Sequence, residues 1–82
     1  MQVEKRRSLR TSLLTELYLY HFANTGLPKQ LDIRTIEADP ERHLAYHYLM
    51  ERDFVRVKHY DRVLSDFKIT AFGIDVVEKN EV

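Results

Sequence analysis

The most chemically suggestive pair of residues in this sequence is His43 and His47, which stand four positions apart. On a helix this spacing places two imidazoles on one face, where they could bind the same metal ion. The residues between them are leucine, alanine and tyrosine, so the glutamate of a metalloprotease motif is missing. His21 and His59 belong to other segments, and no spacing links them to the pair. We therefore expect two surface histidines and no metal site.

Residues for covalent catalysis or phosphoryl transfer are scarce. The chain has no cysteine, and its two glycines, Gly26 and Gly73, are too few and too far apart for a phosphate-binding loop. Its serines lie outside any nucleophile-elbow context. We expect a protein that is not an enzyme and that holds no cofactor.

Basic residues are the remaining candidates for a binding role, and they are unevenly distributed. The chain has 13 basic and 13 acidic residues, whereas a dedicated nucleic-acid-binding domain usually has a basic excess. The densest basic group, here called the N-terminal cluster, consists of Lys5, Arg6, Arg7 and Arg10. Such a group is either an arm that adds nonspecific affinity for nucleic acid or a solubilising, frayed terminus. The sequence alone favours neither alternative.

Length and composition predict one small domain spanning residues 1–82. Hydrophobic residues make up 44% of the chain, too large a share for a disordered segment. No apolar run approaches the roughly 20 residues that a membrane-spanning helix needs, and Met1 to Arg10 is too charged for a signal peptide. We expect a domain that resides in a reducing cytoplasm.

Helical periodicity dominates the first third of the chain. From about Glu4 to Thr25, apolar residues recur at helical spacing in two adjacent stripes. Gly26 can take the left-handed conformation that closes a helix, and Pro28 prevents its continuation. The stripes consist of Leu9, Leu13, Leu17 and Tyr20, and of Leu14, Tyr18 and Phe22.

Residues 28–38 fit two alternatives, a one-turn helix capped by Asp32, which we favour, or a short strand. A clearer helix follows, because Asp39 is a good N-cap and Pro40 suits the first helical position. This helix extends to about Arg52. Its expected buried face consists of Ala45, Tyr48 and Leu49.

Alternating apolar and polar residues predict two strands, at 54–60 and 64–70, which are close enough to form a hairpin. Thr70 is expected to cap a last helix over residues 71–78, and Gly73 would let another backbone approach that helix closely. The order of elements predicts an α+β domain in which three helices supply the core beside one hairpin.

This order, with three short motifs, resembles the winged helix-turn-helix superfamily. The motifs are Asp39-Pro40-Glu41-Arg42, residues 48–55 (YLMERDFV) and residues 68–75 (KITAFGID). In the family, the second motif ends the recognition helix and begins the wing, and the third returns from the wing into a closing helix. The resemblance covers residues 8–79 and is greatest to small, poorly characterised bacterial and phage proteins such as the YjcQ-like ones. It implies a three-helix core, a two- to three-stranded hairpin wing and a closing C-terminal helix.

The resemblance makes residues 40–52 the recognition helix, and it therefore implies contacts to double-stranded DNA. The helix residues expected to face outward, toward base edges, are Arg42, His43, Tyr46 and His47. The candidate phosphate contacts are Arg56, Lys58 and Arg62 on the wing, together with Lys5, Arg6, Arg7 and Arg10. The alternative is a solvated, charged outer face with no partner.

Two functions remain open at this point. One is a small DNA-binding transcriptional regulator that acts as a homodimer, because a single 82-residue module offers limited contact area. Its dimer surface would lie on the first helix around Leu9, Leu13, Tyr18 and Phe22, unless the domain's own core uses these residues. The other is a protein-interaction module of the same fold, which the neutral net charge, the acidic residues around 39–53 and the expected exposure of Tyr46 favour.

Overall fold

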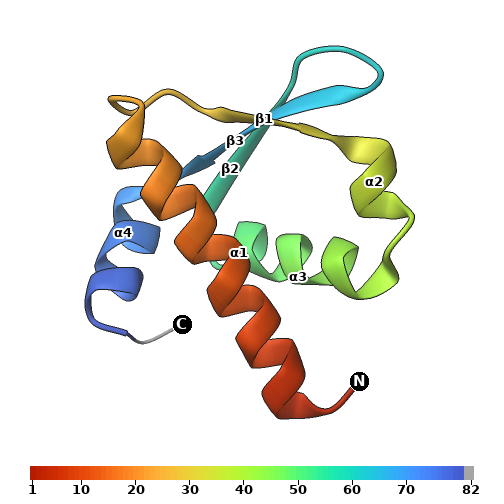
Figure 1. Cartoon of the computed structure of the whole chain (residues 1–82), viewed down its shortest axis with the longest axis vertical. Helices are drawn as coiled ribbons and strands as arrows, with labels where there is room; N and C mark the ends of the chain where they lie inside the picture. The colour runs from red at the N-terminus through yellow and green to blue at the C-terminus, as the bar shows by residue number, and fades with distance from the viewer. Residues whose placement is uncertain (81–82) are drawn as a thin grey trace.

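The computed structural model describes residues 1–80. Its elements follow the order α1 (Val3–Ala23), β1 (Lys29–Asp32), α2 (Ile33–Glu37), α3 (Pro40–Glu51), β2 (Val55–His59), β3 (Leu64–Ile69) and α4 (Ala71–Glu78). The strands form one antiparallel sheet in the order β1-β3-β2. The sheet lies along one side of this α+β domain, and α1, α3 and α4 lie together on the other side (Figure 1). No helix in residues 1–80 has the length and apolar character needed to cross a membrane.

Residues 28–38 contain both of the alternatives that the sequence left open. Residues Lys29–Asp32 pair with β3, from Lys29 opposite Phe67 to Asp32 opposite Leu64. Asp32 then ends the strand and caps α2, because its side chain accepts a hydrogen bond from the N–H of Arg34. The predicted hairpin of β2 and β3 is therefore part of a three-stranded sheet, whose additional strand, β1, precedes α2 and α3 in the chain.

The predicted helix boundaries are confirmed by local geometry. Helix α1 ends in a left-handed turn, with φ of 56° at Thr25 and 80° at Gly26. Asp39 caps α3 through the N–H of Arg42, and Pro40 occupies the start of that helix. Asp53, with φ of 61°, supplies the left-handed residue after α3. Each of these features follows from residue types within one turn of the boundary.

The core forms where α1, α3 and the inner face of the sheet meet. Tyr46 is only 4% exposed, and its ring lies 4.9 Å from that of Phe67 on β3. Tyr48 is 38% exposed, so the expectation that Tyr48 faces inward and Tyr46 outward is wrong. Residues two positions apart on a helix point in directions that differ by about 200°, so only one of the two tyrosines can face the core. The inward position belongs to Tyr46, whose ring packs against Phe67 on β3. The buried hydrophobic residues are Leu13, Leu14, Leu17, Ile36, Ala45, Tyr46, Leu49, Phe54, Val55, Phe67 and Ile69.

The corner between β3 and α4 is built around Gly73, as the sequence predicts. A Cβ on this residue would clash with the carbonyl oxygen of Phe54 and come within 2.7 Å of the Ile69 side chain. Thr70 ties the same corner to the end of α3, because its N–H donates to the Phe54 carbonyl at 2.9 Å and its hydroxyl donates to that of Asp53. The side chain of Thr70 also accepts from the N–H of Gly73 and so caps α4.

The residues expected at a dimer surface on α1 are mostly used within the domain. Leu13 is 1% exposed and belongs to the core, while Leu9 and Tyr18 pack against the core and are half-buried. Phe22 remains 57% exposed, and Leu19, three residues before it, is 61% exposed. The apolar part of α1 that stays open to a partner is therefore its C-terminal end.

Candidate nucleic-acid interface

The solvent face of α3 carries fewer polar candidates than the sequence predicts. Arg42 and His47 are exposed and His43 is half-buried. Tyr46 leaves this face altogether, and its burial raises the pKa of its phenol, with the Glu16 carboxylate adding to the effect and Arg42 opposing it. The same helix exposes Leu44, whose side chain is 61% accessible. The outward surface of α3 is thus partly basic and partly apolar.

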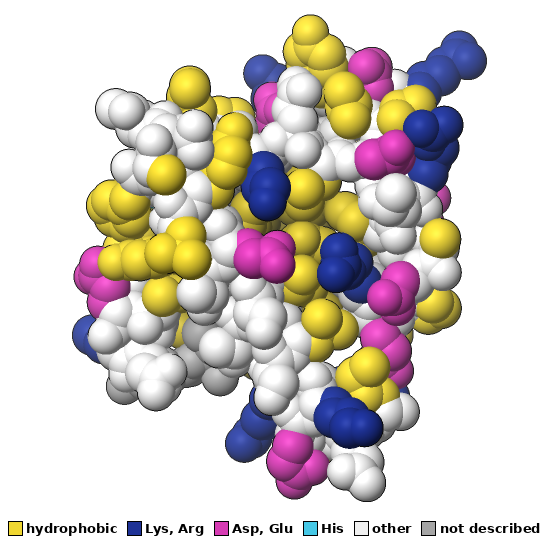
Figure 2. Space-filling model, viewed as in Figure 1, with side chains coloured by type: hydrophobic (Ala, Val, Ile, Leu, Met, Phe, Trp, Pro, Cys, Tyr) yellow, Lys and Arg dark blue, Asp and Glu magenta, His cyan; other side chains and the backbone are white. Residues whose placement is uncertain are grey.

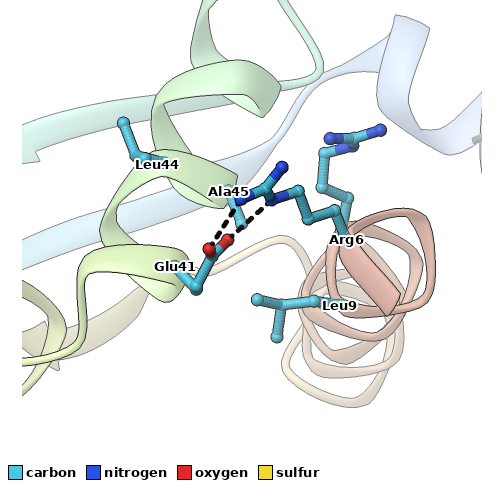
Figure 3. Close-up of a pocket in the computed structure, with 6 residues that line it drawn as sticks. Arg6, Leu9, Glu41, Leu44 and Ala45 are labelled. Atoms are coloured by element: carbon cyan, nitrogen blue, oxygen red, sulfur yellow. Dashed lines mark hydrogen bonds and ion pairs between the residues drawn. The ribbon is translucent and has the colours of Figure 1, made fainter. Parts of the chain in front are cut away.

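The N-terminal cluster is neither an arm nor a frayed end, because α1 already begins at Val3. Arg6 donates two hydrogen bonds, of 3.0 and 3.1 Å, to the carboxylate of Glu41 on α3. The contact raises the pKa of Arg6 and lowers that of Glu41. Figure 3 shows Arg6 reaching from α1 to Glu41, with Leu9 beside the pair. This arginine is committed to packing one helix against the other.

Arg10 is used in the same way one turn later. Its guanidinium carbon lies 4.1 Å above the centre of the Tyr48 ring, a cation–π contact between α1 and α3. Arg6 and Arg10 line a groove of about 330 Å³ between the two helices. Lys5 and Arg7 are exposed on α1, so they are the members of the cluster that keep their charge available to a partner.

The hairpin holds its basic residues differently. Arg56 stands directly opposite Lys68, and Lys58 stands opposite Asp66, all with side chains on the outer face of the sheet. Arg56, Lys58 and Lys68, here called the hairpin cations, are exposed. Within residues 1–80 the ion pairs are Arg6–Glu41 and Arg34–Asp32, so no hairpin cation has a salt-bridge partner there. Lys68 was not among the candidates, because only the cross-strand register brings it to Arg56.

The turn between β2 and β3 is held by hydrogen bonds to the side chain of Asp61. The Asp61 carboxylate accepts hydrogen bonds from the N–H groups of Leu64 at 2.7 Å and Val63 at 2.8 Å. These two contacts lower the pKa of Asp61. Arg62, next to Asp61, is exposed at the tip of the hairpin, at the end of the sheet away from the β3–α4 corner.

The histidines of α3 lie beside the hairpin. The rings of His43 and His47 are 4.5 Å apart. With His59 on β2, both histidines line a depression of about 280 Å³ between α2, α3 and the sheet. His59 Nδ1 lies 2.8 Å from the hydroxyl of Ser65, which is fully buried. Among the described residues, no group of three or more metal-ligating side chains is placed to hold a metal ion.

Charges of both signs are interspersed on the face shown in Figure 2, around a hollow with an apolar floor between α1 and α2. Basic side chains do not merge there into one continuous surface. Any attraction for phosphate therefore comes from local groups of cations, of which the hairpin cations are the clearest in the described part of the chain.

No protein-family model matches this chain, and no curated protein or solved structure was found to match it.

Proposed function

We propose that this domain is a winged helix that binds double-stranded DNA as a transcriptional regulator, with α3 as the recognition helix and β2–β3 as the wing. Two residues, Ala38 and Asp39, separate α2 from α3, and the hairpin follows α3 closely. In helix-turn-helix proteins the second helix enters the major groove, which suits a helix exposing Arg42 and His47. The observation that carries the proposal is the set of hairpin cations without a salt-bridge partner in residues 1–80.

The electrostatics favour weak, salt-sensitive binding. The net charge is zero, so long-range attraction to DNA is small. Asp66 stands opposite Lys58 and weakens its contribution. For each phosphate that a cation contacts, the logarithm of the association constant falls by about 0.9 with every tenfold rise in salt concentration.

Fluorescence anisotropy of a labelled, mixed-sequence duplex tests the proposal. At about 50 mM salt and micromolar protein we expect binding that weakens steeply as salt is raised. Absence of binding under these conditions would remove the proposal, because phosphate contacts are strongest at low salt.

We also propose that the protein acts as a homodimer through the outer face of α1. Ser8, Ser12, Thr15, Leu19 and Phe22 recur there at spacings of four and three residues without a charge among them. Leu19 and Phe22 are exposed and would be the apolar anchors. Light scattering coupled to size exclusion should give a dimer mass for the natural protein and a monomer mass for Leu19→Glu. A monomer mass for the natural protein at high micromolar concentration would contradict the dimer.

A protein-interaction module is the second candidate, and the exposed Leu44 on α3 favours it. An apolar side chain at the centre of a recognition surface suits a protein partner better than base edges. The photo-reactive residue p-benzoylphenylalanine in place of Leu44 should then cross-link one specific protein in the native host. The same residue in place of the exposed Thr35 on α2 serves as the control. Equal labelling at both positions would argue against this candidate.

A further inference from the structure

We propose that the corner between β3 and α4 is a separate binding site for a nucleotide, with the phosphate held by Arg56 and Lys68 and the base lying on Phe72. The site faces a cavity of about 390 Å³. It uses no residue of α3, but it shares Arg56 and Lys68 with the hairpin surface on which the proposed duplex binding rests.

The first observation is the pairing of like charges. Arg56 and Lys68 are directly opposite each other on adjacent antiparallel strands, where Cβ atoms are about 5 Å apart and two cations repel. Asp66, two residues before Lys68 on the same strand face, stands opposite Lys58 and lines a neighbouring depression with both cations. Both cations line the cavity, and none of its lining residues within 1–80 is acidic. A bound phosphate group would relieve the repulsion.

The second observation is the start of α4. Ala71 and Phe72 are the first two residues of this eight-residue helix, and both line the cavity. Thr70 satisfies the third N–H, that of Gly73, but no hydrogen bond is formed by the N–H groups of Ala71 and Phe72 among the described residues. The first turn contains no acidic side chain. Two free donors at the positive end of a helix add to the field of the cations.

The third observation concerns the rest of the wall. Phe72 is 65% exposed, so its ring is open to a stacking partner. His21 also lines the cavity, and its Nδ1 is buried without a hydrogen-bond partner in residues 1–80. A flat base stacked on Phe72 would cover the ring while its phosphate meets Arg56 and Lys68, the combination that nucleotide sites use. The phosphate and base could come from a free nucleotide or from a single strand of nucleic acid.

Titrations of ¹⁵N-labelled protein with AMP and with a five-residue oligodeoxyadenylate test the site by NMR. We expect AMP to shift the amide signals of Ala71 and Phe72, with ribose 5-phosphate binding more weakly and adenosine weaker still. If both AMP and the oligomer shift these signals, the site takes nucleotides in general. Shifts with the oligomer alone would identify a single strand as the ligand.

Three variants separate the parts of the site. Lys68→Gln removes one cation and should weaken AMP binding about tenfold, the usual effect of losing a charged hydrogen bond. Ala71→Pro removes one N–H at a helix position that proline suits, and it should have a similar effect with the fold intact. Phe72→Ala should cost about fivefold or more through lost stacking. Lys5→Gln is the matched control, because Lys5 and His21 lie at opposite ends of α1, about 24 Å apart along the helix.

The site would be refuted if neither AMP nor the oligomer moved the signals of Ala71 and Phe72. It would equally be refuted if Lys68→Gln and Ala71→Pro, both folded by thermal denaturation, bound as tightly as the natural protein. Equal affinity for AMP and ribose 5-phosphate would overturn the role of Phe72. Duplex binding is measured on the same variants. Ala71→Pro and Phe72→Ala lie outside the hairpin and should weaken AMP binding alone, whereas Lys68→Gln should weaken both activities.

Discussion

The two basic regions of this molecule use their charges in opposite ways. On α1, Arg6 lies in a bidentate pair with Glu41 and Arg10 lies over the ring of Tyr48. On the hairpin, Arg56 and Lys68 face each other across two strands with no salt-bridge partner in residues 1–80. The first arrangement joins two helices, and the second leaves positive charge free for a ligand. Basic residues in a sequence therefore indicate a binding surface only after their intramolecular partners are known.

The largest expected effect concerns the corner that supports the hairpin. Gly73→Ala would place a Cβ against the Phe54 carbonyl, which also accepts a hydrogen bond from the N–H of Thr70 at 2.9 Å. We expect a loss of about 3 kcal/mol in the free energy of unfolding, at the upper end for overpacked sites. Urea denaturation measures it.

The other glycine provides the control for this prediction. Gly26→Ala introduces a side chain at a positive φ, but with ordinary contact distances around it. It should cost about 1 kcal/mol. If the two variants were equally stable, the corner would not be the rigid support that holds Arg56 and Lys68 together.

Removing charge first from the hairpin cations and then from the N-terminal cluster tests directly whether only the hairpin charges are free for a ligand. Arg56→Gln with Lys58→Gln should weaken binding to duplex DNA roughly 60-fold at about 0.1 M salt, since each phosphate contact contributes about a factor of eight there. The salt slope should fall by about 1.8. Arg6→Gln with Arg10→Gln removes the same charge and should change the affinity little. Affinities are measured by anisotropy titrations at several salt concentrations. Equal weakening of DNA binding by the two double variants would contradict the different roles assigned to the two basic regions.

The parts of the fold that could be predicted from sequence depend on local chemistry. Asp39 before Pro40 marks a helix start because an N-cap and its helix are neighbours in the chain. Thr70 and Gly73 likewise define the start of α4 within four residues. Asp32 was ambiguous for the same reason, since it ends one element and caps the next.

The parts that could not be predicted depend on contacts between distant segments. Tyr46 and Tyr48 have the same chemistry, and the contact of the buried Tyr46 with Phe67 joins residues that are twenty-one positions apart in the chain. Arg6 and Glu41 are separated by 35 residues, so the sequence gives no sign that this arginine is occupied. The pairing of Arg56 with Lys68 follows from the strand register, which also depends on the length of the turn at Asp61.

A smaller effect is expected from the aromatic contact that occupies Arg10. Arg10→Ala removes the cation over Tyr48, and an exposed contact of this kind is worth about 0.5–1 kcal/mol. Arg7→Ala is the control, because Arg7 is exposed on the same helix. Chemical denaturation should rank Arg10→Ala as the less stable variant. Identical midpoints would mean that Arg10 is available to a ligand after all.

The smallest effect is a pH dependence of the contact between Arg6 and Glu41. The hydrogen bonds from Arg6 hold the pKa of Glu41 below its ordinary value, so the folded state binds the proton less readily than the unfolded state does. The stabilisation is therefore complete above the unfolded pKa of about 4.3 and is lost as the pH falls through the folded pKa. A double-mutant cycle with Arg6→Gln and Glu41→Gln should give a small favourable coupling at neutral pH that decreases as the Glu41 carboxylate is protonated in acid. It should also shrink in about 1 M salt, because both side chains are partly open to solvent. A coupling that persisted at low pH would mean that the two helices are joined there by packing around Leu9 rather than by charge.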